Sequence, residues 1–98
     1  MKTLALITEK NDTASAQWQF DKVMSVITFD VNLSVIFMFD GITQLQYNKA
    51  WKCLEIYGIE SVFVYEKSDN PTEEYILDIP IINNVSLKSL IKQSDLII

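Results

Sequence analysis

Residues 33 to 45 read Leu-Ser-Val-Ile-Phe-Met-Phe-Asp-Gly-Ile-Thr-Gln-Leu, and this stretch decides the fold of the chain. Five consecutive apolar residues, Val35 to Phe39, run directly into Asp40 and Gly41. A short apolar run without alternation is typical of a strand buried on both faces of a parallel sheet. Because Asp-Gly favours a sharp turn, we expect this turn at the carboxyl edge of the sheet, where α/β proteins place ligands and contacts.

Four other stretches predict strands. Thr3–Thr8 and Ser61–Tyr65 have apolar centres and predict further buried strands of the same sheet. Tyr75–Ile82 alternates loosely and contains Pro80, which has no backbone donor, so it predicts a weak or edge strand. The apolar residues of Asp95–Ile98 predict a final short strand.

Helical periodicity appears between these strands. From Ala14 onward the apolar residues fall on one helical stripe, and Asp12 and Thr13 precede it as plausible N-caps. The members of that stripe are Ala16, Phe20, Val23, Met24 and Ile27. Ser86 is predicted to cap a last short helix, whose inward residues are Leu87, Leu90 and Ile91.

A further helix is predicted over Tyr47–Tyr57, and Gly58 suits the position just past its end. Its expected inward stripe is Tyr47, Ala50, Trp51, Leu54 and Tyr57. The order of elements predicts a single domain over residues 1–98. Its fold class is α/β, a three-layer α/β/α sandwich on a mainly parallel five-stranded sheet.

The charge pattern excludes several classes of function. The formal net charge is −5, and the chain has neither arginine nor histidine. An acidic chain without arginine forks is unsuited to binding nucleic acid directly, and no imidazole is available as a general base or zinc ligand. The single cysteine excludes an internal disulfide and fits a reducing compartment. With no signal-peptide pattern and no membrane-length apolar run, we expect a cytoplasmic protein.

Motifs for cofactors or catalysis are missing. Two glycines, Gly41 and Gly58, cannot form a phosphate-binding glycine-rich loop, so no nucleotide cofactor is expected. Ser68 has no histidine to activate it, and the adjacent acids Glu73 and Glu74 have the pattern of a solvated loop. The sequence thus predicts neither a catalytic constellation nor a metal site.

Three residues have two readings each. Trp18 lies off the centre of its helical stripe and is either a partly buried surface aromatic or a subunit contact. Cys53 is expected at the middle of its helix, as a structural half-buried thiol or as a reactive one. Asp40 either caps the turn after the central strand or helps to shape a subunit contact or a thiol pocket supplied by a neighbour.

Residues 33–45, with the Asp-Gly-Ile-Thr-Gln-Leu sequence at their end, resemble the TusC/DsrF sulfur-relay family of the DsrE-like superfamily. Two other pieces agree in order and spacing. Lys52–Val64 is similar to the family's helix, Tyr-x-Ile-Glu link and third strand, and Ser89–Ile98 to its closing helix and strand. The chain departs from the family in being shorter and in opening its first helix with Asn-Asp-Thr-Ala-Ser at 11–15.

The resemblance implies a subunit rather than a complete enzyme. Members of the superfamily assemble as heterohexamers of three related small chains, which pass persulfide sulfur toward tRNA 2-thiouridine or serve sulfur oxidation. The sulfur-carrying cysteine belongs to the DsrE/TusD-type chain, on the loop after its third strand. Here that region is Tyr65–Asp69, without cysteine, so the chain resembles the cysteine-less partner of DsrE/TusD-like and DsrH/TusB-like subunits.

The sequence therefore leads to one main hypothesis and two alternatives. The main hypothesis is a non-catalytic subunit of a sulfur-relay complex, with candidate interface residues Asp40, Gly41, Gln44, Leu45 and Trp18. One alternative is a sulfurtransferase that uses Cys53 as its own nucleophile. The other is a DsrE-like homo-oligomer that binds a small molecule at the edge of the sheet.

Overall fold

The structure is a computed structural model that describes residues 2–29, 32–66 and 79–98. Its strands are β1 (Lys2–Ile7), β2 (Asn32–Met38), β3 (Val62–Tyr65), β4 (Ile81–Ile82) and β5 (Leu96–Ile97). Its α-helices are α1 (Ala14–Thr28), α2 (Ile42–Tyr47), α3 (Cys53–Ile56) and α4 (Asn84–Gln93). Two 3-10 turns, η1 (Phe39–Gly41) and η2 (Lys49–Lys52), lie on either side of α2.

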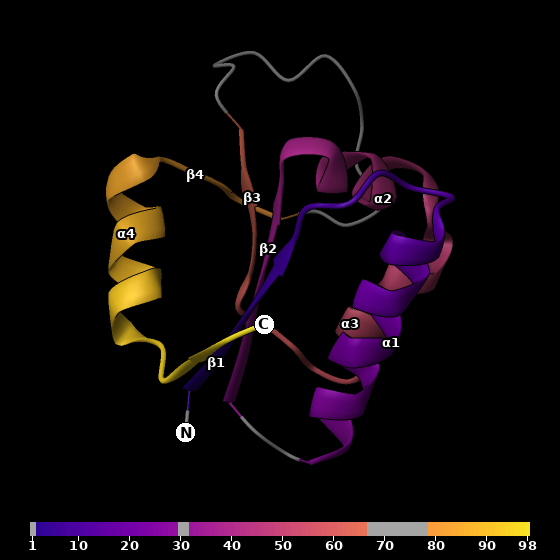
Figure 1. Ribbon diagram of the computed structural model, residues 1–98. Coiled ribbons are helices and arrows are strands. Elements are labelled where there is room, and N and C mark those ends of the chain that lie inside the picture. The colour runs from indigo at the N-terminus through magenta and orange to yellow at the C-terminus, as the bar shows by residue number, and fades with distance from the viewer. Residues whose placement is uncertain (1, 30–31, 67–78) are drawn as a thin grey trace.

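The five strands form one sheet in the order β4-β3-β2-β1-β5, and every neighbouring pair is parallel. The quoted stretch supplies β2, the central strand, which pairs along its length with β1 from Lys2↔Asn32 to Ile7↔Phe37. Helices α1, α2 and α3 lie on one side of the sheet and α4 on the other (Figure 1). The predicted α/β class and the central place of this strand are confirmed.

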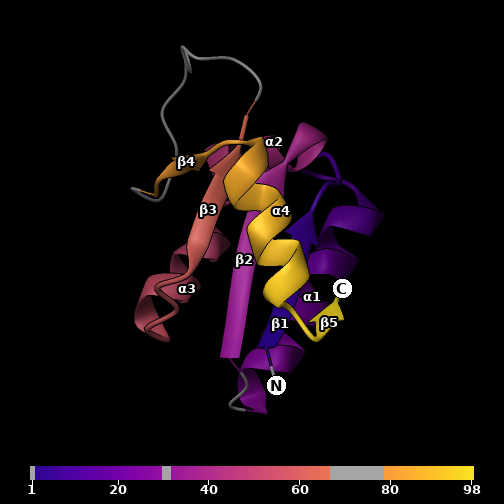
Figure 2. The ribbon, with the colours of Figure 1, turned by 90° about the vertical axis from the view of Figure 1, so that its left-hand side faces the viewer.

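The two faces of the sheet are covered unequally. On the face of α1 to α3, Trp51 is buried, with the rings of Phe20 and Phe37 against it edge-on at centroid distances of 4.9 and 5.0 Å. The opposite face has a smaller cluster around Leu4 and Ile36, over which α4 lies (Figure 2). The larger share of the core therefore lies between the sheet and the helices that follow β1 and β2.

The helix predicted over Tyr47–Tyr57 is wrong in its bounds. Helix α2 begins at Ile42 and ends at Tyr47, and the chain restarts as η2 and α3 after Asn48. The Asn48 side chain accepts a hydrogen bond from the amide of Ala50 at 3.1 Å, an alternative to continuing the helix. Of the expected inward stripe only Trp51 and Leu54 are buried, whereas Tyr47, Ala50 and Tyr57 are exposed.

Helix ends follow local capping chemistry. Of the two possible caps, Thr13 caps α1 by accepting from the amide of Ala16. Asn83, and not Ser86, caps α4, because its Oδ1 accepts from the Ser86 amide at 2.9 Å. This cap places the helix earlier than predicted, and Ile91 is exposed instead of inward.

Gly58 follows the C-cap of α3 with φ of +71°, as predicted for the position past a helix end. The amides of Gly58 and Ile59 donate to the carbonyls of Glu55 and Leu54, the paired bonds of a Schellman ending. A weak strand was predicted over Tyr75–Ile82. The structure has β4 at the end of this range, and residues 75–78 lie outside the described residues. Ser68, Glu73 and Glu74 lie outside them too.

Candidate functional site at the carboxyl edge of the sheet

The exit of β2 carries an exposed aromatic residue that the sequence pattern placed inside the strand. Phe39 begins η1 with φ of +54°, and its side chain is 61% exposed. This left-handed conformation is unfavourable for a bulky residue and is found where the surrounding structure imposes it. Nothing in the apolar run 35–39 distinguishes Phe39 from its buried neighbours, so only the backbone geometry shows that it points to solvent.

Asp40 follows on the same surface. Its side chain is exposed, and the N-cap positions of η1 and α2 are Met38 and Gly41, neither with a side-chain capping hydrogen bond. The turn is closed instead by Thr43, whose hydroxyl donates to the Asp40 carbonyl at 2.6 Å. The reading of Asp40 as a side-chain cap is therefore wrong, and its carboxylate faces solvent next to Phe39.

Gly41 is buried and lies against the end of β1. A Cβ atom at this position would lie 1.8 Å from the Ile7 carbonyl oxygen and 2.8 Å from the Thr8 nitrogen. The φ of Gly41 is −63°, which any residue adopts, so glycine is needed for space and not for conformation. The chain that leaves β2 can thus cross directly over the end of β1.

Two buried or half-buried amides hold the loop after β1. Gln44 is fully buried, donates to the Glu9 carbonyl at 2.7 Å and accepts from the Trp51 indole nitrogen at 3.2 Å. Gln19 of α1 accepts from the backbone amides of Thr8 and Glu9 at 3.3 and 3.2 Å. The side chains of α1 and α2 therefore replace the sheet hydrogen bonds that the backbone loses where β1 ends.

This network corrects part of the predicted interface. Gly41, Gln44 and Leu45 are all buried within the chain, so they cannot contact a partner directly. The Asp-Gly-Ile-Thr-Gln-Leu sequence has three structural roles instead. Gly41 allows the close crossing over β1, the Thr43 hydroxyl closes the turn, and Gln44 supplies the buried amide. Gln19 was not predicted as a functional residue. The available signal is its position as a glutamine on the flank of an apolar helical stripe.

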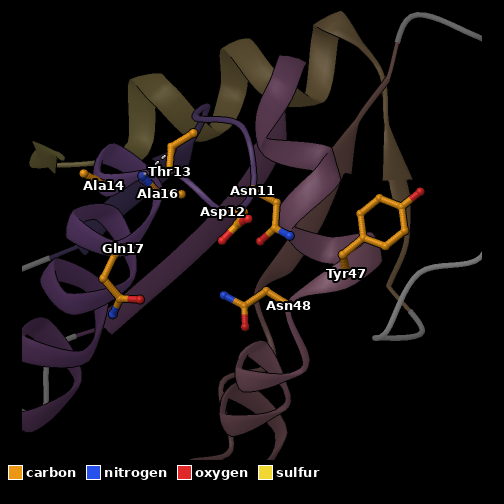
Figure 3. Close-up of a pocket in the computed structure, with 8 residues that line it drawn as sticks. All are labelled: Asn11, Asp12, Thr13, Ala14, Ala16, Gln17, Tyr47 and Asn48. Atoms are coloured by element: carbon orange, nitrogen blue, oxygen red, sulfur yellow. Dashed lines mark hydrogen bonds between the residues drawn. The ribbon is translucent and has the colours of Figure 1, made fainter.

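A polar hollow of about 530 Å³ lies beside this network, between the start of α1 and the end of α2. It is lined by Asn11, Asp12, Thr13, Ala14, Ala16, Gln17, Tyr47 and Asn48. Asp12, Gln17 and Asn48 surround the same space, while the ring of Tyr47 extends away from it (Figure 3). The lining residues of this hollow offer amide groups and one carboxylate, and they include no lysine. Such a lining suits a small hydroxylated or cationic molecule better than an anion.

Trp18 lies on the outer side of α1, 65% exposed, with the Lys22 ammonium 4.4 Å from the ring centroid. It does not line the polar hollow and comes from a different element than Asp40. Trp18 is therefore a surface aromatic partly covered by a lysine. Its role as a subunit contact stays a prediction.

Cys53 is the first residue of α3 and not the middle of a helix. Its thiol is half-buried, and Sγ lies 3.5 Å from Sδ of Met24 in α1. Burial is the largest effect and raises the pKa of the thiol above its ordinary value of 9.0, against a smaller lowering by a backbone hydrogen bond. At neutral pH Cys53 is a protonated thiol packed against another sulfur, a poor setting for a nucleophile.

Within the described parts of the chain, no three side chains of the Cys, Asp and Glu types gather closely enough to bind a metal ion. No α-helix there has the length and apolar character to cross a bilayer. Comparison with protein-family models and a search of curated proteins both give no match to this chain.

Proposed function

We propose that this chain is a non-catalytic subunit of a sulfur-relay complex of the TusBCD/DsrEFH kind, in which a related chain carries the persulfide. The observation that carries the proposal is the surface at the end of β2. Phe39 and Asp40, both exposed, are neighbours in the sequence there, within the stretch that resembles the TusC/DsrF family. That surface offers contacts and no nucleophile.

The position of the only thiol supports the same proposal. Cys53 is protonated and half-buried, and it packs against Met24 and the larger core cluster. A chain whose thiol is this poorly activated can contribute to sulfur transfer by covering a partner's persulfide and excluding water from it. It need not accept sulfur itself, which disfavours the alternative of a sulfurtransferase that uses Cys53.

The exposed aromatic side chain of Phe39 is suited to contact a partner chain. Aromatic side chains are enriched at protein interfaces, and charged residues beside them contribute to the choice of partner. Phe39 and Asp40 would therefore contact the neighbouring subunit near its persulfide loop. The proposed place of action is the cytoplasm, with tRNA wobble-uridine 2-thiolation as the proposed destination of the sulfur.

The test is purification of the affinity-tagged chain from its own cells, followed by native mass spectrometry. We expect two co-purifying small chains, one with a cysteine on the loop after its third strand, in a complex with two copies of each chain. Sulfur transfer to tRNA should depend on this chain and survive Cys53→Ser. A chain that stays free of both partners when they are co-expressed would overturn the proposal.

The polar hollow favours one second candidate, binding of a small molecule at the edge of the sheet. Its volume of about 530 Å³ falls in the range of small-molecule sites, and its walls come from two segments of the chain, residues 11–17 and 47–48. A thermal-shift screen of polyols, amines and amino acids would test this candidate. A hit that Asp12→Asn abolishes supports it, and a screen without stabilising compounds removes it.

A further inference from the structure

Helix α4 has a basic outer face that nothing else in the described chain covers. The face is lined by Val85, Lys88, Ser89, Ile91 and Lys92, and Val85 is 76% exposed. In Figure 2 the helix is the element nearest the viewer, in front of the sheet. Positions 85, 88, 89 and 92 recur at the spacing of one helical stripe, so these side chains form one continuous surface.

The charge of this face differs from that of the rest of the chain. Helix α4 contains Lys88 and Lys92 and no acidic residue, in a chain whose net charge is −5. Within residues 2–29, 32–66 and 79–98 no ion pair is found for Lys88 or Lys92, and both side chains are exposed. Two unpaired cations beside exposed apolar side chains suit an acidic surface with an apolar centre.

The same chain has such a surface on the opposite side of the sheet. A hollow of about 260 Å³ lies at the end of α3, with apolar walls from Leu54, Ile59, Val62, Ile79 and Pro80. Glu55 and Glu60 also line this hollow. Next to them in sequence, Ile56 is 81% exposed and Tyr57 is exposed as well. We call this surface the Glu55–Glu60 hollow.

We propose that the outer face of α4 docks onto the Glu55–Glu60 hollow of a second copy of this chain. An apolar side chain of α4, Val85 or Ile91, enters the apolar hollow, and Lys88 and Lys92 meet Glu55 and Glu60 at its rim. The apolar contact supplies most of the affinity, and the ion pairs determine which surfaces meet.

The two surfaces lie on opposite sides of the sheet, because α4 covers one face and α3 belongs to the other (Figure 1). One pair of copies therefore leaves a free α4 face at one end and a free hollow at the other. Such head-to-tail contacts build a closed ring or a growing chain of copies, and not a two-fold dimer. This inference does not rest on the proposed function, since both surfaces are on the chain itself.

Sedimentation velocity of the purified chain tests it, from low micromolar to submillimolar concentration and at low and high salt. We expect the average mass to rise with concentration and self-association to weaken at high salt, because the ion pairs are exposed. The variant Lys88→Glu with Lys92→Glu and the variant Glu55→Lys with Glu60→Lys should each associate about tenfold or more weakly. An equimolar mixture of the two variants should associate again, since each then offers the surface that the other lacks.

Lys10→Glu with Lys22→Glu is the matched control for the Lys88→Glu, Lys92→Glu variant, because it also replaces two lysines with glutamates, at positions outside both surfaces. Equal weakening by this control would show a general charge effect and overturn the inference. A monomer at every concentration would also overturn it, as would a mixture of reversed variants that does not recover. Far-UV circular dichroism confirms folding, and the salt dependence of the unmodified chain tests the inference without any substitution.

Discussion

Gly41 packs directly on the backbone of Ile7, since a Cβ atom at position 41 would lie 1.8 Å from the Ile7 carbonyl oxygen. This contact joins the turn after β2 to the end of β1. The neighbouring atoms are backbone, so they cannot move aside as a flexible side chain could. The packing of the central strand and the path of the chain over the sheet edge therefore depend on one missing methyl group.

Gly41→Ala should lower the free energy of unfolding by about 3 kcal/mol or more, because the added methyl forces β1 and the turn apart. Urea denaturation measures the loss. Gly58→Ala is the matched control: a Cβ there meets no atom within 4 Å, but its φ is +71°. That variant should lose only about 1 kcal/mol, from left-handed strain. Equal losses in the two variants would contradict the close contact at Gly41.

Gln44→Leu should destabilise the fold by about 1–3 kcal/mol, because the Trp51 indole nitrogen and the Glu9 carbonyl lose their partner. The shape of the side chain is roughly kept, so the loss reports hydrogen bonding. Gln17→Ala is the control, since the exposed Gln17 side chain donates to Asp21 on the surface of α1, and it should change stability by less than about 0.5 kcal/mol. Trp51→Phe in the Gln44→Leu background should cost less than in the native chain, as a double-mutant cycle would show.

Phe39→Gly should change the stability of the fold and the binding of partner subunits in opposite directions. Glycine adopts the left-handed conformation of position 39 without strain, so the free energy of unfolding should rise by about 1 kcal/mol. Under the proposed function the same variant should bind its partner subunits at least about tenfold more weakly, because it removes an exposed aromatic contact. Chemical denaturation and a binding titration measure the two effects. Unchanged binding would remove Phe39 from the proposed interface.

Asp40→Ala should leave the stability of the isolated chain within about 0.5 kcal/mol, because the Asp40 carboxylate caps neither η1 nor α2. Assembly with the partner subunits should weaken more than folding does. Asp12→Asn offers a comparison, because Asp12 is an exposed acid that lines the polar hollow and asparagine tolerates its φ of +64°. A drop in melting temperature as large as the loss of assembly would show that Asp40 acts on the fold alone.

The strands along the chain, the central place of β2 and the main core residues followed from apolar runs, because burial on both faces of a parallel sheet leaves a pattern in the sequence. Val35 and Phe37 illustrate this, and both are fully buried. The helix predicted over Tyr47–Tyr57 was misplaced. A single side chain, Asn48, ends α2 through a local hydrogen bond, and the sequence pattern gives little sign of it.

The candidate site was only partly predictable. Gly41 and Gln44 were recognised as special, but a motif does not show whether a residue faces a partner or the interior of its own chain. That depends on how β1 and α2 meet, a contact between segments about 35 residues apart in sequence. Phe39 was missed for the same reason, since its exposure comes from a backbone conformation at the strand end.

Cys53 provides the last prediction, from its raised pKa and its contact with Met24. The folded chain binds the thiol proton more tightly than the unfolded chain, whose thiol titrates near 9.0. Below that pH both states keep the proton, so the thiol contributes nothing to the pH dependence of stability. As pH rises above about 9, the unfolded state loses its proton first, so the free energy of unfolding falls with pH.

Cys53→Ala should remove this part of the decline, at a cost of about 1 kcal/mol at neutral pH for the lost packing on Met24. The difference between the unmodified chain and the variant, measured by urea denaturation from pH 7 to 10, isolates Cys53 from the tyrosines and lysines that also titrate there. Alkylation by iodoacetamide at neutral pH should be slower in the folded chain than in urea. Faster alkylation of the folded chain would mean an activated thiol and would favour the sulfurtransferase alternative.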